Sequence, residues 1–233
     1  NYQVKKTAKG DWRRNDQALK EEGLVTQMLA KDAVNLIAKH DATTPLFLLA
    51  AFSAPGADAS AATGYAAGVS ALDDAVGQIV GEKKKKNLLS NTLIIFHSDN
   101  GGAVPTKFAT GDNDVKKSGA DNGTYREGKG SLYEGGVRVA ALAAWPEKIK
   151  PKSVVTRLLH VTDMYATLLN IAGAKLDQPR KLDGLDVWKT LAEEQLSPRE
   201  EILLNVEDFR GAIRVGEWKL IVRAALPSKL ELF

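Results

Sequence analysis

The chain has 233 residues, of which 44% are apolar and 26% charged, and it contains no cysteine. This composition is typical of a globular protein and excludes a disordered, collagen-like or disulfide-stapled chain. The net charge is +3, from 32 Lys and Arg against 29 Asp and Glu, so charge favours neither a nucleic acid nor a membrane surface as partner. The longest apolar stretch, residues 45–54, is about half as long as a membrane-spanning helix.

Helices and strands are predicted to alternate in the first half of the chain. Apolar residues at steps of three and four predict amphipathic helices over residues 24–37 and 65–80. Continuous apolar runs at residues 45–52 and 91–96 predict strands that are buried on both faces of a parallel sheet. The alternation predicts an α/β fold with a right-handed crossover.

The second half of the chain is predicted to begin with a long loop. Residues 99–136 contain nine glycines and little apolar periodicity, and loops of this length usually carry function. A strand is predicted over residues 137–144. A helix is predicted over residues 162–172, with Thr162 or Asp163 as N-cap and Gly173 at its C-terminal end. A small antiparallel sheet is predicted over residues 202–206, 211–215 and 218–222.

The sharpest local signal is His-Ser-Asp-Asn-Gly-Gly at residues 97–102, directly after the predicted strand 91–96. Ligands bind beyond the carboxyl ends of strands in open α/β sheets, which is where Asp99 and Asn100 stand. A carboxylate and an amide oxygen are hard ligands that suit Ca²⁺ or Mg²⁺. The alternative is an Asx turn that leads into the two glycines, and spacing alone leaves both interpretations open.

A second signal lies at residues 128–138, Gly-Lys-Gly-Ser-Leu-Tyr-Glu-Gly-Gly-Val-Arg. Glycines let a backbone approach an anion closely, and Lys129 between two of them supplies a compact charge for an oxyanion. Glu134 and Arg138 are expected to form a structural pair. The lysine run 83–86 is expected to be a solvated helix end, where the dipole favours cations, rather than a polyanion site.

Taken together, the motifs resemble the type I sulfatases, and more narrowly the arylsulfatase B-like bacterial arylsulfatases. The resemblance runs over nearly the whole chain. It is carried by the two motifs above and by Leu-Asp-Asp-Ala-Val-Gly at 72–77, Thr-Asp-Met-Tyr-Ala-Thr-Leu-Leu at 162–169, Leu-Asp-Gly-Leu-Asp-Val-Trp at 182–188, Ser-Pro-Arg-Glu-Glu at 197–201 and Gly-Glu-Trp-Lys-Leu at 216–220.

The resemblance implies an alkaline-phosphatase-like α/β fold, with a mixed sheet flanked by helices and a small C-terminal antiparallel sheet. Residues 1–184 would be part of the core, and residues 185–233 the start of a β-rich subdomain. The implied activity is hydrolysis of sulfate esters at a Ca²⁺ site with a formylglycine nucleophile, in the periplasm or an extracellular space. Asp99 and Asn100 match two metal ligands, and Lys129 matches the lysine that holds the substrate sulfate. Asn after this Asp favours sulfatases over phosphatase relatives, which usually have His there.

The departures from the family are equally specific. The family's modification motif, Cys or Ser followed by x-Pro-x-Arg, is absent from the chain, and so are the family's upstream metal ligands. The sequence Ser197-Pro198-Arg199 differs from the motif in both its position and its spacing. Gly56 stands where the family has an active-site His. The chain is therefore predicted to be the middle-to-C-terminal portion of a sulfatase, inactive alone, with the missing N-terminal portion as a partner. The alternatives are a non-catalytic binding module and a phosphate- or phosphonate-ester hydrolase. His97 is expected to pack or hydrogen-bond locally, and His40 and His160 to be structural or surface residues.

Overall fold

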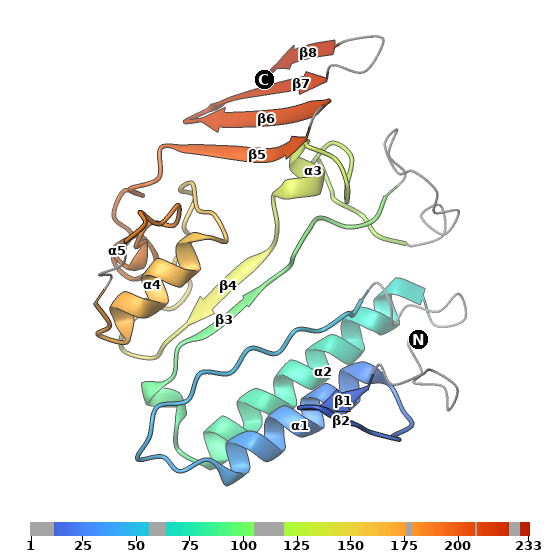
Figure 1. Cartoon of the computed structure of the whole chain (residues 1–233), viewed down its shortest axis with the longest axis vertical. Helices are drawn as coiled ribbons and strands as arrows, with labels where there is room; N and C mark the ends of the chain where they lie inside the picture. The colour runs from blue at the N-terminus through green and yellow to red at the C-terminus, as the bar shows by residue number, and fades with distance from the viewer. Residues whose placement is uncertain (1–11, 56–63, 105–118, 176–178, 208, 224–228) are drawn as a thin grey trace. The chain divides into compact units, whose positions relative to one another are not determined.

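The computed structural model describes residues 12–55, 64–104, 119–175, 179–207, 209–223 and 229–233. The chain divides into two compact units (Figure 1). The first unit comprises Asn1–Thr92 and Asp99–Val139, and the second comprises Leu93–Ser98 and Ala140–Phe233. The expected boundary at residue 184 stays a prediction. None of the helices in the described ranges combines the length and the apolar character that a membrane span requires.

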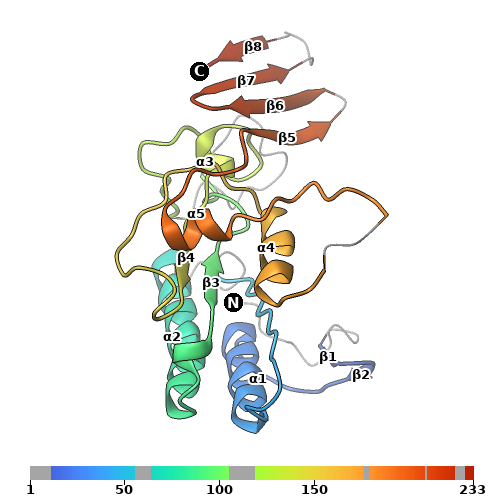
Figure 2. The same cartoon turned by 90° about the vertical axis from the view of Figure 1, so that its left-hand side faces the viewer.

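Two long helices form the core of the first unit. They are α1 (Val25–Lys39) and α2 (Gly64–Lys85), which confirms both predicted helices, and they lie side by side (Figure 2). The smaller elements of this unit are β1 (Arg13–Arg14), β2 (Gln17–Ala18), the 3₁₀ turn η1 (Leu89–Asn91) and α3 (Glu134–Val137). The side chains buried in the two long helices are mostly small, namely Thr26, Ala30, Ala33 and Ile37 in α1 and Ala75 in α2.

The lysine run forms the last turn of α2 and continues one residue beyond it, at the helix end as predicted, and Lys86 also binds α1. Lys86 donates from Nζ to the carbonyl oxygen of Ala38 at 3.0 Å and to that of His40 at 3.5 Å. The last carbonyls of a helix lack intrahelical partners and attract cations. The two helices therefore end at the same side of the unit, and Lys86 stabilises the end of α1.

The structure contradicts the strand predicted over residues 45–52. This stretch is extended but belongs to no strand, and within the described ranges it forms no parallel pairing with the strand after it. Phe47 and Leu49 are 76% and 77% exposed. A strand requires hydrogen bonds to a neighbouring backbone as well as the right side chains, and the apolar run specified only the side chains.

In the described part of the chain, the second unit contains two sheets. In the first, β3 (Ile94–His97) pairs with β4 (Ala141–Ala144), so the strands predicted at 91–96 and 137–144 are found with shorter bounds. The pairing is antiparallel and β3 is at most half-buried, so the prediction of a parallel sheet buried on both faces is wrong for the described part of the chain. Side-chain pattern does not specify the direction of the neighbouring strand. Helix α4 (Asp163–Ile171) has Thr162 at its N-cap position, but the Thr162 side chain makes no capping hydrogen bond. Gly173 follows the helix with φ +71°, as predicted. Helix α5 (Trp188–Glu193) was not predicted, because six residues are too few for a clear period.

The C-terminal sheet is antiparallel, with the order β5-β6-β7-β8 (Figure 1). Its strands are β5 (Glu201–Glu207), β6 (Arg210–Val215), β7 (Trp218–Arg223) and β8 (Lys229–Leu232). The first three confirm the predicted runs, and β8 was not predicted. Leu203, Ile213, Leu220 and Leu232 lie opposite one another across the four strands and so share one face.

Candidate functional site

The predicted site residues lie in two loop segments of the first unit, residues 99–104 and 119–133. Asp99 and Asn100 follow β3 directly in the chain, with Asp99 exposed and Asn100 half-buried. Asn100 donates from Nδ2 to the carbonyl oxygen of Gly101 at 2.9 Å. This bond orients the side-chain amide of Asn100.

Backbone hydrogen bonds join the two loop segments. The amide of Lys129 donates to the carbonyl oxygen of Gly102 at 3.0 Å, and the amide of Gly101 donates to that of Gly136 at 2.9 Å. The backbone of Lys129 therefore lies beside the segment that carries Asn100, although 29 positions separate the two residues in the sequence. The Lys129 residue itself is exposed. The structure thus brings all three predicted site residues into one pair of neighbouring loops.

Glycines are required where the loops meet. A Cβ on Gly101 would overlap the carbonyl oxygen of Gly135, and a Cβ on Gly128 would overlap that of Gly102. Any side chain at either position would push the segments apart. Gly101 and Gly128 therefore allow a close approach of backbones, which is one of the established uses of glycine.

Asn122 is a site residue that the sequence analysis missed. Its Oδ1 accepts the amide of Gly102 at 2.8 Å, and its Nδ2 donates to the carbonyl oxygens of Gly102 at 3.1 Å and Glu127 at 2.8 Å. Asp-Asn-Gly at residues 121–123 is a turn signal, and Gly123 does donate to Asp121 Oδ1 at 2.8 Å. That signal is local and carries no information about a contact twenty residues away.

Ion pairs and aromatic contacts brace the second loop segment. Arg138 lies 4.0 Å from Glu134, which confirms the predicted structural pair, and its guanidinium carbon lies 5.0 Å from the centre of the Tyr125 ring. Arg126 stacks in the same way on Tyr133 at 3.9 Å. Such cation–π contacts stabilise a loop through the attraction between a cation and the face of an aromatic ring.

The donor chemistry of Asp99 and Asn100 fits part of a calcium site. Ca²⁺ takes six to eight oxygen ligands, and carboxylates and amide carbonyls are typical ones. Within the described ranges no group of three or more His, Cys, Asp or Glu side chains could hold a metal ion. Two oxygen ligands are fewer than Ca²⁺ takes, so a complete site would require oxygen ligands from further residues.

The three histidines make local contacts, as expected. A ring nitrogen of His97 lies 3.1 Å from the carbonyl oxygen of Ser98, and one of His40 lies 2.9 Å from the carbonyl oxygen of Thr44. In His160 a ring nitrogen lies 2.8 Å from Thr162 Oγ1. Gly56, the position expected to lack the family's His, lies outside the described residues.

The Ser-Pro-Arg segment is an anchor of the second unit. Ser197 donates from Oγ to the carbonyl oxygen of Leu158 at 2.7 Å, and Arg199 forms an ion pair with Asp163, donating from Nε to its Oδ2 at 2.8 Å. The Asp163 side chain is fully buried. Burial alone would raise the pKa of Asp163, but hydrogen bonds from Arg199 and from the amides of Leu185 and His160 hold that pKa below its usual value.

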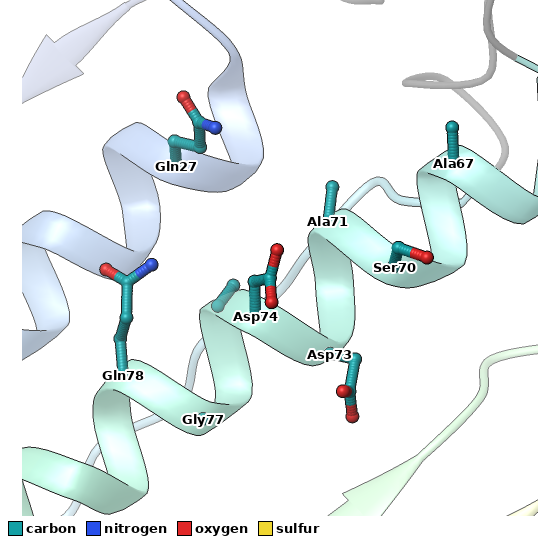
Figure 3. A pocket seen from close by; sticks show the side chains of 9 residues that line it. Gln27, Ala67, Ser70, Ala71, Asp73, Asp74, Gly77 and Gln78 are labelled. Carbon is teal, nitrogen blue, oxygen red and sulfur yellow. The ribbon is translucent and has the colours of Figure 1, made fainter.

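An open pocket of about 740 Å³ lies between α1 and α2, apart from these loops (Figure 3). Gln27 and Gln78 line it together with small residues of α2. Asp73 and Asp74 also border it, but Figure 3 shows their carboxylates pointing in different directions. Its lining contains none of the three predicted site residues.

The comparisons with known proteins agree with the motifs. A family model described as Sulfatase matches residues 3–174. The chain is 32% identical to mouse (Mus musculus) arylsulfatase J over 208 residues, which are 83% of this chain and 33% of that protein. It is also 32% identical to pig (Sus scrofa) N-acetylgalactosamine-6-sulfatase over 188 residues, 76% of this chain and 34% of that protein. The chain thus spans about a third of the length of these curated relatives.

A solved structure supports the fold as well. The crystal structure of Ps i-CgsB in complex with k-i-k-neocarrahexaose has a TM-score of 0.78 and 29% sequence identity, covering 94% of this chain and 50% of that one. The predicted fold class, α/β and alkaline-phosphatase-like with a small C-terminal antiparallel sheet, is confirmed. Since the family model matches well over half of its residues, the chain belongs to the sulfatase family.

Proposed function

We propose that this chain forms the part of a sulfate-ester hydrolase that binds the substrate sulfate and half of a Ca²⁺ site. The observation that carries the proposal is the hydrogen bond from the Lys129 amide to the Gly102 carbonyl, two residues after Asn100. It draws an anion-binding side chain and two oxygen ligands into neighbouring loops. A sulfate oxygen between them would meet positive charge from both sides.

Each residue has a distinct role in this proposal. Lys129 holds a sulfate oxygen through its ammonium and stabilises the charge that develops as the S–O bond breaks. Asp99 and Asn100 donate their side-chain oxygens to the metal ion, which when bound supplies positive charge at the sulfate. The nucleophile, a formylglycine in the family that the chain resembles, comes from a segment outside these 233 residues. The chain by itself is therefore proposed to be inactive.

The proposed substrates are sulfate monoesters of the arylsulfatase type, and the proposed compartment is the periplasm or an extracellular space. Both curated relatives are named for sulfatase activity, one on aryl sulfates and one on N-acetylgalactosamine 6-sulfate. These names support the reaction, and they leave the aryl and the sugar sulfate as two substrates to compare.

The test uses protein purified from the organism that produces it, through an affinity tag on this chain. Any contiguous or associated segment that carries the nucleophile is then purified with it. The captured protein is assayed with 4-nitrophenyl sulfate, N-acetylgalactosamine 6-sulfate and 4-nitrophenyl phosphate. We expect sulfate hydrolysis that depends on Ca²⁺. Lys129→Ala should lower kcat/KM by about a hundredfold or more with the metal content intact, and Asp99→Ala should lose the bound metal ion.

The matched control is Lys31→Ala, which removes an exposed lysine of α1 in the same unit and should leave the kinetics unchanged. Faster hydrolysis of the phosphate than of either sulfate would replace the proposal with a phosphate-ester hydrolase. Absence of hydrolysis in the captured protein would favour the non-catalytic binding module. Loss of calcium in Lys129→Ala would show that this lysine supports the metal site rather than the substrate.

A further inference from the structure

The amide side chain of Asn122 bridges the two loops of the candidate site. It accepts the amide of Gly102 and donates to two carbonyl oxygens, those of Gly102 and Glu127, at 2.8 to 3.1 Å. Both polar groups of Gly102 are thus paired with one side chain, as in a short β-bridge. Asn122 is half-buried, so water competes only partly for these bonds.

The same carbonyl oxygen also accepts the hydrogen bond that holds Lys129. The Gly102 carbonyl oxygen accepts Asn122 Nδ2 at 3.1 Å, the Lys129 amide at 3.0 Å and the Val104 amide at 3.0 Å. The position of this carbonyl bears directly on where the backbone of Lys129 lies. Asn122 is the side chain that also holds the amide of the same residue, Gly102.

The chemistry of the junction requires an amide at position 122. Two carbonyl oxygens face the side chain and accept from its Nδ2, while the amide of Gly102 donates to its Oδ1. Asparagine supplies two donors and one acceptor on a single short planar group. A carboxylate has the same shape but would place a negative oxygen against the two carbonyl oxygens.

We infer that Asn122 is a positioning residue that fixes Lys129 relative to Asn100, and hence the sulfate contact relative to the metal ligands. The catalytic part of this inference rests on the proposed role of Lys129. Asn122 itself is proposed to touch neither substrate nor metal. It acts through the Gly102 peptide.

The first test needs no activity and uses the 233-residue chain. Amide hydrogen exchange is measured residue by residue for the wild type, Asn122→Ala, Asn122→Asp and the surface control Asn35→Ala on α1. In both Asn122 variants we expect the amide of Lys129 to exchange at least about tenfold faster, although Asn122 makes no bond to it. The amides of α1 and α2 should keep their protection. An unchanged Lys129 amide in Asn122→Ala would overturn the inference, and so would loss of protection throughout the unit.

The second test is a double-mutant cycle on the captured, active protein. Asn122→Ala should lower kcat/KM for the sulfate ester by about tenfold or more, because a misplaced charge stabilises the transition state less. If Asn122 acts through Lys129, the Asn122→Ala, Lys129→Ala double variant should be no slower than Lys129→Ala alone. Losses that multiply would overturn the inference and leave the proposed function standing. A Lys129→Ala variant with wild-type kinetics would instead refute the proposed function, and hydrogen exchange would still decide whether Asn122 positions Lys129.

Discussion

Gly128 shows at the scale of one residue how the candidate site is built. A Cβ at this position would overlap the carbonyl oxygen of Gly102, which is backbone and has little room to move. Gly77 in α2 is the matched opposite, because a Cβ there would meet nothing within 4 Å. Gly128 thus has backbone atoms packed against it in a loop, whereas Gly77 faces open space on a helix.

We predict that Gly128→Ala lowers the melting temperature. Gly77→Ala should raise it slightly, because alanine is the better helix former and adds about 0.5–1 kcal/mol to the free energy of unfolding. Thermal unfolding followed by circular dichroism measures both. Gly128→Ala should also abolish protection of the Lys129 amide. Equal melting temperatures for the two variants would mean that the loops can separate at little cost.

The site could be predicted from the sequence only in part. Asp99, Asn100 and Lys129 stand in short motifs whose residue types suggest metal and anion chemistry. Asn122 has no such motif, because its role depends on bonds to residues that fold next to it from elsewhere in the chain.

The pair of Asp163 and Arg199 acts at the scale of elements. Asp163 begins α4 and accepts the backbone amides of His160 and Leu185, while Arg199 precedes β5 and also donates to the carbonyl oxygen of Asp183 at 2.8 Å. One ion pair therefore ties together the start of a helix, the segment before α5 and the segment before the C-terminal sheet.

We predict that Arg199→Ala destabilises the protein by about 3 kcal/mol or more, because it leaves the buried Asp163 carboxylate without its partner. Urea unfolding measures this loss. The control is Arg14→Ala, whose pair with Asp32 is exposed on both sides, and its unfolding midpoint should not change. A small effect of Arg199→Ala would mean that the backbone amides alone satisfy Asp163.

The same pair predicts a dependence of stability on pH. The pKa of Asp163 is lower in the folded protein than its usual value, because the hydrogen bonds of the ionised form outweigh the burial that would raise it. The carboxylate therefore contributes stability above the pKa of the unfolded chain, and this contribution is lost as the pH falls through the folded pKa. Unfolding free energy should decline below about pH 4, and the decline should be shallower in Arg199→Ala.

The two faces of the C-terminal sheet differ in their exposure to solvent. Ile202, Ala212 and Ile221 are buried on one face. The other face carries a continuous apolar surface that is exposed or half-buried, formed by Leu203, Ile213, Val215, Trp218, Leu220, Val222, Leu230 and Leu232. Exposed apolar areas of more than a few hundred Å² are rare in soluble monomers.

We predict that the native chain binds the dye ANS on this apolar face. Trp218→Lys, which changes a side chain that is 65% exposed on β7, should reduce the fluorescence enhancement. Leu196→Lys is the control, because Leu196 is 73% exposed but lies outside the sheet. Equal signals from the wild type and Trp218→Lys would show that the dye binds elsewhere.

The elements whose pattern is local were predicted correctly. Apolar residues at helical spacing specify α1 and α2 within a few residues, because a helix hydrogen-bonds within itself. Residues 45–52 carry the side chains of a buried strand, but the backbone hydrogen bonds of a strand come from elsewhere, and in the described structure that segment is unpaired. Short elements such as α5 and β8 have too few residues to show a period.

Motifs and periods lie in neighbouring residues, so the family, the two long helices and the three residues on which the proposed chemistry depends can be recognised in the sequence. Which of those residues come together, and what holds them there, follows from tertiary contacts. The bond between Lys129 and Gly102, the bridge from Asn122 to Gly102 and the pair of Asp163 with Arg199 join residues that are 20 to 36 positions apart. Such contacts depend on the path of the whole backbone, and no local pattern of residue types encodes them.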